Sequence, residues 1–68
     1  MHETMGQIIK RLRKERGLTQ ESLAERLGVT FQAVSKWENG TAAPSTTNLM
    51  AMAKLFGVEA AELLKEAQ

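Results

Sequence analysis

The chain has 68 residues, a formal net charge of +1 and no cysteine. Its length allows one small domain, and the lack of thiols excludes disulfides and cysteine-based metal sites. General acid–base or nucleophilic catalysis is disfavoured, because the chain contains no Asp, no Tyr and a single His near its start, so we expect neither an enzyme nor a bound metal or cofactor.

Apolar residues recur at the period of an α-helix along most of the chain, and no stretch alternates as a strand would. The spacing predicts helices at residues 5–16, 20–27, 31–38, 46–56 and 60–66. Their inner faces carry the expected core residues: Met5, Ile8, Ile9, Leu12, Leu23, Ala24, Leu27, Val34, Trp37, Leu49, Met52, Ala53, Phe56, Leu63 and Leu64. The predicted fold class is all-α, a compact five-helix bundle that forms a single domain over residues 1–68, with a short flexible N-terminus at about residues 1–4.

The first predicted helix carries most of the positive charge. Within residues 1–16, five basic residues outnumber two acidic ones and give +3, whereas residues 17–40 and 41–68 each sum to −1. Such a segment can favour a polyanion without a high overall pI. An ordinary solvated helix face explains the same charges equally well.

Polar residues and glycines mark the helix boundaries. Thr19, Thr30 and Ser45 are suitable N-caps for the second, third and fourth helices, whereas Glu59 is a weak cap for the fifth. Four of the five glycines follow a predicted helix, as C-terminal capping glycines do, and Gly6 instead lies at the start of the first helix.

The second and third predicted helices are joined by a very short connection. Only Gly28 and Val29 separate Leu27 from Thr30, and a turn this tight favours a residue that tolerates positive φ. Ala24 is small enough to let the third helix approach the second closely. This pattern is typical of a helix-turn-helix, whose second helix enters the DNA major groove.

These residues resemble the Cro/repressor-like (Xre-type) bacterial DNA-binding proteins. The resemblance covers nearly the whole chain, from "IIKRLRKERGLTQ" to "NLMAMAKLFGVEAAELL". In the second and third helices it depends on Leu23, Ala24, Leu27, Gly28, Val29, Val34 and the closing "WENG" of residues 37–40. It implies a sequence-specific double-stranded DNA-binding protein that regulates transcription, and we expect a repressor that occludes a promoter. Two positions depart from the family: Thr41 replaces a frequent basic residue, and Glu59 replaces a Ser, Thr or Asp cap.

The outward residues of the third helix are the candidates for reading DNA bases. Val34 and Trp37 are committed to the core, which leaves Phe31, Gln32, Ser35 and Lys36 facing the groove. Gln pairs with adenine, Lys donates to guanine, and Phe packs on thymine methyl groups. Phe31 could instead pack onto the second helix or a neighbouring chain, and for Ser35 the contact and the structural reading are nearly balanced.

Four residues are candidates for contacting phosphates. Gln20 opens the second helix, where free N–H groups attract anions, and the resemblance gives the matching Gln a backbone contact. The resemblance adds Thr30, Asn39 and Thr41, although Thr30 also has a purely structural interpretation as a helix cap.

The resemblance further implies a structural ion pair between Arg13 and Glu38, which would join the first helix to the end of the third. The alternative is a free Arg13 that faces DNA.

The expected partner is double-stranded DNA, bound by a homodimer on a near-palindromic operator with half-sites ~34–36 Å apart. No apolar run approaches the ~20 residues of a membrane span, and residues 1–12 lack the apolar core of a signal peptide, so we expect a cytoplasmic, nucleoid-associated protein without a membrane partner. Two alternatives remain: a protein-interaction module of the antitoxin type, with a protein partner, and the DNA-binding piece of a larger regulator.

Overall fold

The computed structural model describes residues 3–64, which form helices and no strand. The helices are α1 (Met5–Glu15), α2 (Gln20–Leu27), α3 (Phe31–Asn39), α4 (Thr46–Phe56) and α5 (Ala60–Leu63). The predicted all-α, five-helix fold class is confirmed. α5 ends at Leu63, earlier than predicted, and residues 65 and 66 of the predicted helix lie outside the described residues.

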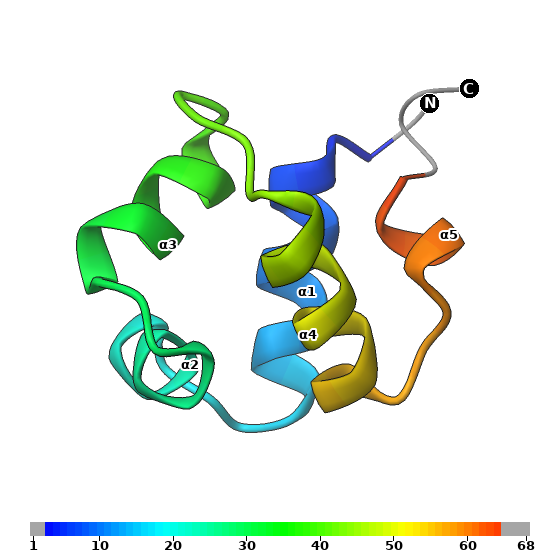
Figure 1. The fold of residues 1–68 in the computed structure, drawn as a ribbon, viewed down its shortest axis with the longest axis horizontal. Coiled ribbons are helices and arrows are strands. Elements are labelled where there is room, and N and C mark those ends of the chain that lie inside the picture. The colour runs from blue at the N-terminus through cyan, green and yellow to red at the C-terminus, as the bar shows by residue number, and fades with distance from the viewer. Residues whose placement is uncertain (1–2, 65–68) are drawn as a thin grey trace.

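The helices form a bundle around α1 and α4 (Figure 1). α2 and α3 pack against each other on one side, and α5 packs against α4 on the other. α1 also contacts α3 and α5, and α2 contacts α4. α1 therefore packs against α3, the second helix of the α2–α3 pair, and not mainly against α2. None of the helices within residues 3–64 is long and apolar enough to cross a membrane.

One continuous core joins the five helices. Its buried apolar members are Ile8, Ile9, Leu12, Leu23, Ala24, Val34, Trp37, Leu49, Met52, Ala53, Phe56 and Leu63. Met5 and Leu27 are half-buried and pack against this core. The prediction that Leu64 faces inward is wrong, because 42% of it is exposed while Leu63 is fully buried. Consecutive helical residues point about 100° apart, so the single turn of α5 buries only one of the two.

Side-chain caps fix where the helices begin. The hydroxyls of Thr19, Thr30 and Ser45 each accept a hydrogen bond from the backbone N–H three residues later, as predicted. Glu59 makes no side-chain cap hydrogen bond. A side-chain cap stabilises a helix by about 1 kcal/mol. The start of α5 lacks this stabilisation, which the other four helices have.

The connection between α2 and α3 is a left-handed turn at Gly28, whose φ is 71°. Its successor, Val29, donates from its N–H to the Ala24 carbonyl at 3.0 Å, which closes the end of α2. A residue with a Cβ is strained at this φ. Because glycine has none, the chain can turn sharply here, and Thr30, the N-cap of α3, follows only two residues later.

The predicted flexible N-terminus covers residues 1–4, of which 1 and 2 lie outside the described residues. Thr4 and Gln7 form a capping box at the start of α1, with Gln7 N–H bonded to Thr4 Oγ1 at 3.1 Å and Thr4 N–H bonded to Gln7 Oε1 at 2.8 Å. Glu3 bonds to Arg11. The Thr-x-x-Gln spacing is a sequence signal for this box that the sequence analysis missed.

Candidate nucleic-acid interface

The outward face of α3 carries the predicted base-reading residues. Gln32 and Lys36 are exposed, and Phe31 is 45% exposed although it is large and apolar. Ser35 is half-buried. Val34, on the opposite face of the same helix, is fully buried. α3 is therefore amphipathic, with one face in the core and a mixed aromatic and polar face in solvent.

Gln32 and Lys36 lie one helical turn apart, so their side chains project from the same face. Neither side chain has a hydrogen bond or ion pair with any residue in the described part of the chain. The amide can both donate and accept, and the ammonium group has three donors. The two side chains thus offer uncommitted hydrogen-bonding groups beside the exposed ring of Phe31.

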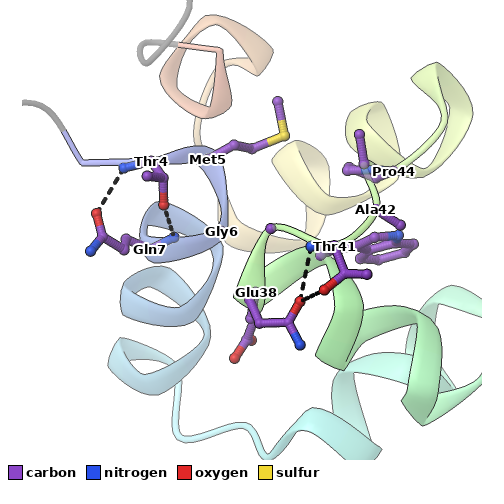
Figure 2. Close-up of a pocket in the computed structure, with 12 residues that line it drawn as sticks. Thr4, Met5, Gly6, Gln7, Glu38, Thr41, Ala42 and Pro44 are labelled. Atoms are coloured by element: carbon purple, nitrogen blue, oxygen red, sulfur yellow. Dashed lines mark hydrogen bonds between the residues drawn. The ribbon is translucent and has the colours of Figure 1, made fainter.

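A local turn stabilised by Asn39 and Thr41 follows the end of α3. Asn39 Oδ1 accepts hydrogen bonds from the backbone N–H of Thr41 at 2.9 Å and from the Thr41 hydroxyl. The dashed lines at Thr41 in Figure 2 show both bonds. This local turn commits the acceptor oxygen of Asn39 and leaves its side-chain NH2 group as a donor. Thr30, at the other end of α3, accepts from Ala33 N–H at 3.2 Å.

Arg13 and Glu38 form a buried ion pair between α1 and α3. Arg13 Nε lies 2.6 Å from Glu38 Oε2, and Arg13 Nη2 donates to Glu38 Oε1 at 3.1 Å. Their side chains are 8% and 5% exposed. Arg13 Nη1 also donates to the Leu18 carbonyl at 2.8 Å. Each of the three guanidinium nitrogens thus donates inside the domain, so Arg13 is not the free side chain that the alternative of a DNA-facing Arg13 requires.

Gln20 contacts the same pair. Its side-chain Nε2 donates to Glu38 Oε1 at 3.0 Å, and the residue is half-buried at the start of α2. This bond was not predicted from the sequence, because Gln20 and Glu38 belong to different helices and no local spacing relates them. The carboxylate of Glu38 therefore joins three helices: α1 through Arg13, α2 through Gln20, and α3 through its own backbone.

Most of the positive charge near the N-terminus is paired with carboxylates. Arg11 lies 3.0 Å from Glu3 and 3.5 Å from Glu15, and Arg16 lies 3.2 Å from Glu15. The hydrogen bond with Glu3 raises the pKa of the Arg11 guanidinium above its ordinary value. Of the five basic residues in this segment, only the exposed Lys10 and Lys14 have no such partner among the described residues. The segment is a weaker source of attraction for a polyanion than its sequence charge indicates.

A hollow separates the start of α1 from the segment that follows α3. Figure 2 shows Thr4, Met5 and Gly6 on one side and Glu38, Thr41 and Pro44 on the other. At the base of the hollow α1 and α3 are in direct contact. A Cβ built on Gly6 would lie only 2.4 Å from the Glu38 carbonyl oxygen. Within residues 3–64 no three His, Cys, Asp or Glu side chains are grouped to hold a metal ion.

Residues 9–63 match the sequence model of a family described as helix-turn-helix. The chain belongs to this family. Its α2 and α3 form the helix-turn-helix, and α3 is the helix that the corner at Gly28 presents to solvent. The resemblance to Xre-type and lambda-repressor-like proteins is thereby confirmed.

The sequence is similar to those of proteins named as transcriptional regulators. The chain is 45% identical over 56 residues to the HTH-type transcriptional activator BcrR of Enterococcus faecalis, a match that covers 82% of this chain and 28% of that protein. An uncharacterized HTH-type transcriptional regulator of Methanothermobacter thermautotrophicus is 46% identical over 55 residues, covering 81% of this chain and 80% of that one. These names disfavour the alternative of an antitoxin-type interaction module.

A solved helix-turn-helix structure has the same fold. The P22 c2 repressor in complex with a synthetic operator superimposes with a TM-score of 0.88 at 33% identity, covering 94% of this chain and 97% of that chain. The chain thus corresponds to nearly all of this solved domain, whereas it spans less than a third of the length of BcrR.

Proposed function

We propose that this helix-turn-helix protein binds double-stranded DNA sequence-specifically, reads the major groove with α3 and regulates transcription. The observation that carries the proposal is the solvent face of α3, where Phe31, Gln32 and Lys36 are exposed and the two polar side chains have no partner in the described residues. Exposed Gln and Lys side chains are usual on a surface, whereas an exposed large ring on the same helix as these groups is the notable feature. A base edge offers acceptors, donors and methyl groups that match them.

The base-reading roles follow from the chemistry of each side chain. Gln32 pairs with adenine N6 and N7, Lys36 donates to guanine O6 and N7, and Phe31 packs on thymine methyl groups. Each good bidentate pair discriminates between bases by ~1–3 kcal/mol. Ser35 is half-buried and contributes a shorter-range contact at the edge of this set.

The phosphate contacts flank α3. Gln20 and the free N–H groups at the start of α2 receive one phosphate. Thr30 lies at the first turn of α3, and the Asn39–Thr41 turn lies at its end, so donors are available at both ends of the reading helix. Phosphate contacts fix the register of the protein on DNA, and the ion pair of Arg13 and Glu38 holds the helices that carry them.

A single small reading helix supplies limited affinity, so the functional species is a homodimer on a near-palindromic operator with half-sites ~34–36 Å apart. It acts at the nucleoid in the cytoplasm, as a repressor that occludes a promoter. The solved P22 c2 repressor, which the chain matches over nearly its full length, supports repression.

The test is selection of bound duplexes from a random pool at two salt concentrations. The proposal expects enrichment of an inverted repeat, with binding that weakens steeply as salt rises because phosphate contacts release counterions. A protein that enriches no sequence at low salt contradicts the proposal. Enrichment of a single half-site without a repeat contradicts the proposed homodimer but not sequence-specific DNA binding.

A further inference from the structure

Glu38 has more hydrogen-bonding partners than a two-residue ion pair requires. Its Oε2 faces Arg13 Nε, while its Oε1 accepts from both Arg13 Nη2 and Gln20 Nε2, at 3.1 and 3.0 Å. The Glu38 side chain is 5% exposed, so these donors replace water rather than compete with it. The third of these donor atoms belongs to Gln20, which is the first residue of α2 and is only half-buried.

The bond from Gln20 fixes an otherwise loose group. The terminal torsion of a glutamine side chain is broad and roughly two-fold, so a free amide exchanges its oxygen and nitrogen positions readily. A carboxylate accepts hydrogen bonds and cannot donate them, which excludes the flipped amide, whose Oε1 would face Glu38. With Nε2 held against Glu38, one Nε2 proton is used and the second is left for another acceptor.

We infer that Glu38 is a positioning residue for DNA binding, whose carboxylate holds the Gln20 side-chain amide with its second Nε2 proton available to a phosphate oxygen. The inference rests on the proposed function, which gives Gln20 a phosphate contact. It assigns a binding role to a residue whose side chain is almost completely buried and touches no nucleic acid.

Arg13 has a necessary part in this arrangement. A lone carboxylate next to a phosphate site would repel the phosphate, and the repulsion is strong where water is excluded. The two-point contact of the guanidinium with Glu38 neutralises that charge inside the protein. Phosphate therefore meets a neutral, oriented donor, and neither member of the ion pair needs to reach the DNA.

A purely structural ion pair would stabilise the fold and leave the orientation of Gln20 without consequence. The double variant Arg13→Met/Glu38→Leu separates the two roles, because replacing a buried ion pair by apolar residues of similar size is often neutral or stabilising. The matched control is Glu3→Leu/Arg11→Met, which makes the same replacements at an exposed pair away from Gln20. Thermal unfolding reports the stability of each, and affinity is measured on the selected operator and on unrelated duplexes.

We expect the Arg13/Glu38 double variant to stay folded and to bind all duplexes about tenfold more weakly, the same loss that we expect for Gln20→Ala. The control should stay within about twofold of wild type. Adding Gln20→Ala to the double variant should cause no further loss. The dependence of log affinity on log salt should keep its slope, since neither the lost contact nor the replaced pair changes the net charge facing DNA.

A measurement on the free protein covers the case in which the double variant does not fold. In wild type the side-chain NH2 of Gln20, assigned by its disappearance in Gln20→Ala, should show restricted ps–ns motion by NMR relaxation. A freely mobile amide in wild type overturns the inference. So does wild-type affinity in a folded double variant, or a full additional loss when Gln20→Ala is added to it. If wild type binds no duplex at low salt, the proposed function fails and the inference falls with it.

Discussion

Gly6 of α1 lies directly against the backbone of Glu38 at the end of α3. A Cβ on Gly6 would be 2.4 Å from the Glu38 carbonyl oxygen and 2.5 Å from that of Trp37, closer than real Cβ contacts come. Both neighbours are backbone atoms, which cannot rotate away as a side chain can. This close approach seats α1 behind α3 and sets the distance that Arg13 and Glu38 bridge.

Substitution of Gly6 by alanine tests this contact, because two effects oppose each other. Helix propensity favours alanine over glycine by ~1 kcal/mol. Overpacking against rigid backbone costs about 1–3 kcal/mol or more. We expect the steric cost to dominate and Gly6→Ala to lower the melting temperature. Lys10→Ala, at an exposed position of the same helix, should stay within about 0.5 kcal/mol. A raised melting temperature for Gly6→Ala would show that α1 stands further from α3.

The ion pair of Arg13 and Glu38 should be costly to break from either side. Removing one partner leaves an uncompensated buried charge, at about 3–5 kcal/mol. A 68-residue domain has a total stability of about 3–10 kcal/mol, so Arg13→Ala and Glu38→Ala should each unfold much of the protein at moderate temperature. Thermal melting of the single variants and of Arg13→Ala/Glu38→Ala should show a double loss smaller than the sum. Small, additive losses would mean that the two side chains are not coupled.

The start of α5 offers a stabilising substitution. Glu59 occupies the N-cap position without a side-chain cap bond, and Glu62 is the third residue of the helix. Glu59→Ser creates the Ser-x-x-Glu spacing of a capping box, which should add about 0.5–1 kcal/mol. The melting temperature should then rise by several degrees, as it does for small domains at this change in free energy. Glu59→Ala is the control, and equal melting of the two variants would refute the capping argument.

Loss of a base-reading residue should change the sequence preference of binding, whereas loss of a phosphate-contacting residue should change the overall affinity. Gln32→Ala and Lys36→Ala remove groups that distinguish bases, so they should broaden the set of bound sequences. Gln20→Ala removes a contact that all duplexes share, so it should weaken binding uniformly and leave the preferred sequence intact. Selection from a random duplex pool with each variant measures both. An unchanged preference in the first two variants would remove α3 from base reading.

The local features of the fold were predictable from the sequence. Helix positions follow from apolar spacing, and their beginnings follow from Thr19, Thr30 and Ser45, because a cap acts on amides within one turn. The exposure of Gln32 and Lys36 follows from the burial of Val34 on the opposite face. Each of these depends on residues no more than a few positions apart.

The Arg13–Glu38 contact was expected through a family resemblance, not through any rule of spacing. The net charge of residues 1–16 was a poor guide to how strongly this segment attracts a polyanion, since a net charge does not say which side chains form ion pairs. Arg11 and Arg16 form ion pairs with carboxylates, which reduces the positive electrostatic potential of the segment.

The sequence by itself determined the five helices, the caps at Thr19, Thr30 and Ser45, the left-handed corner at Gly28 and most of the core. Only the tertiary structure decided that α1 touches α3 at Gly6, that Gln20 bonds to Glu38, and that Leu64 stays in solvent. The physical reason is the range of the forces involved. Helix formation and capping are settled within one or two turns of chain, whereas a contact between distant residues depends on how whole helices cross and how closely their backbones approach.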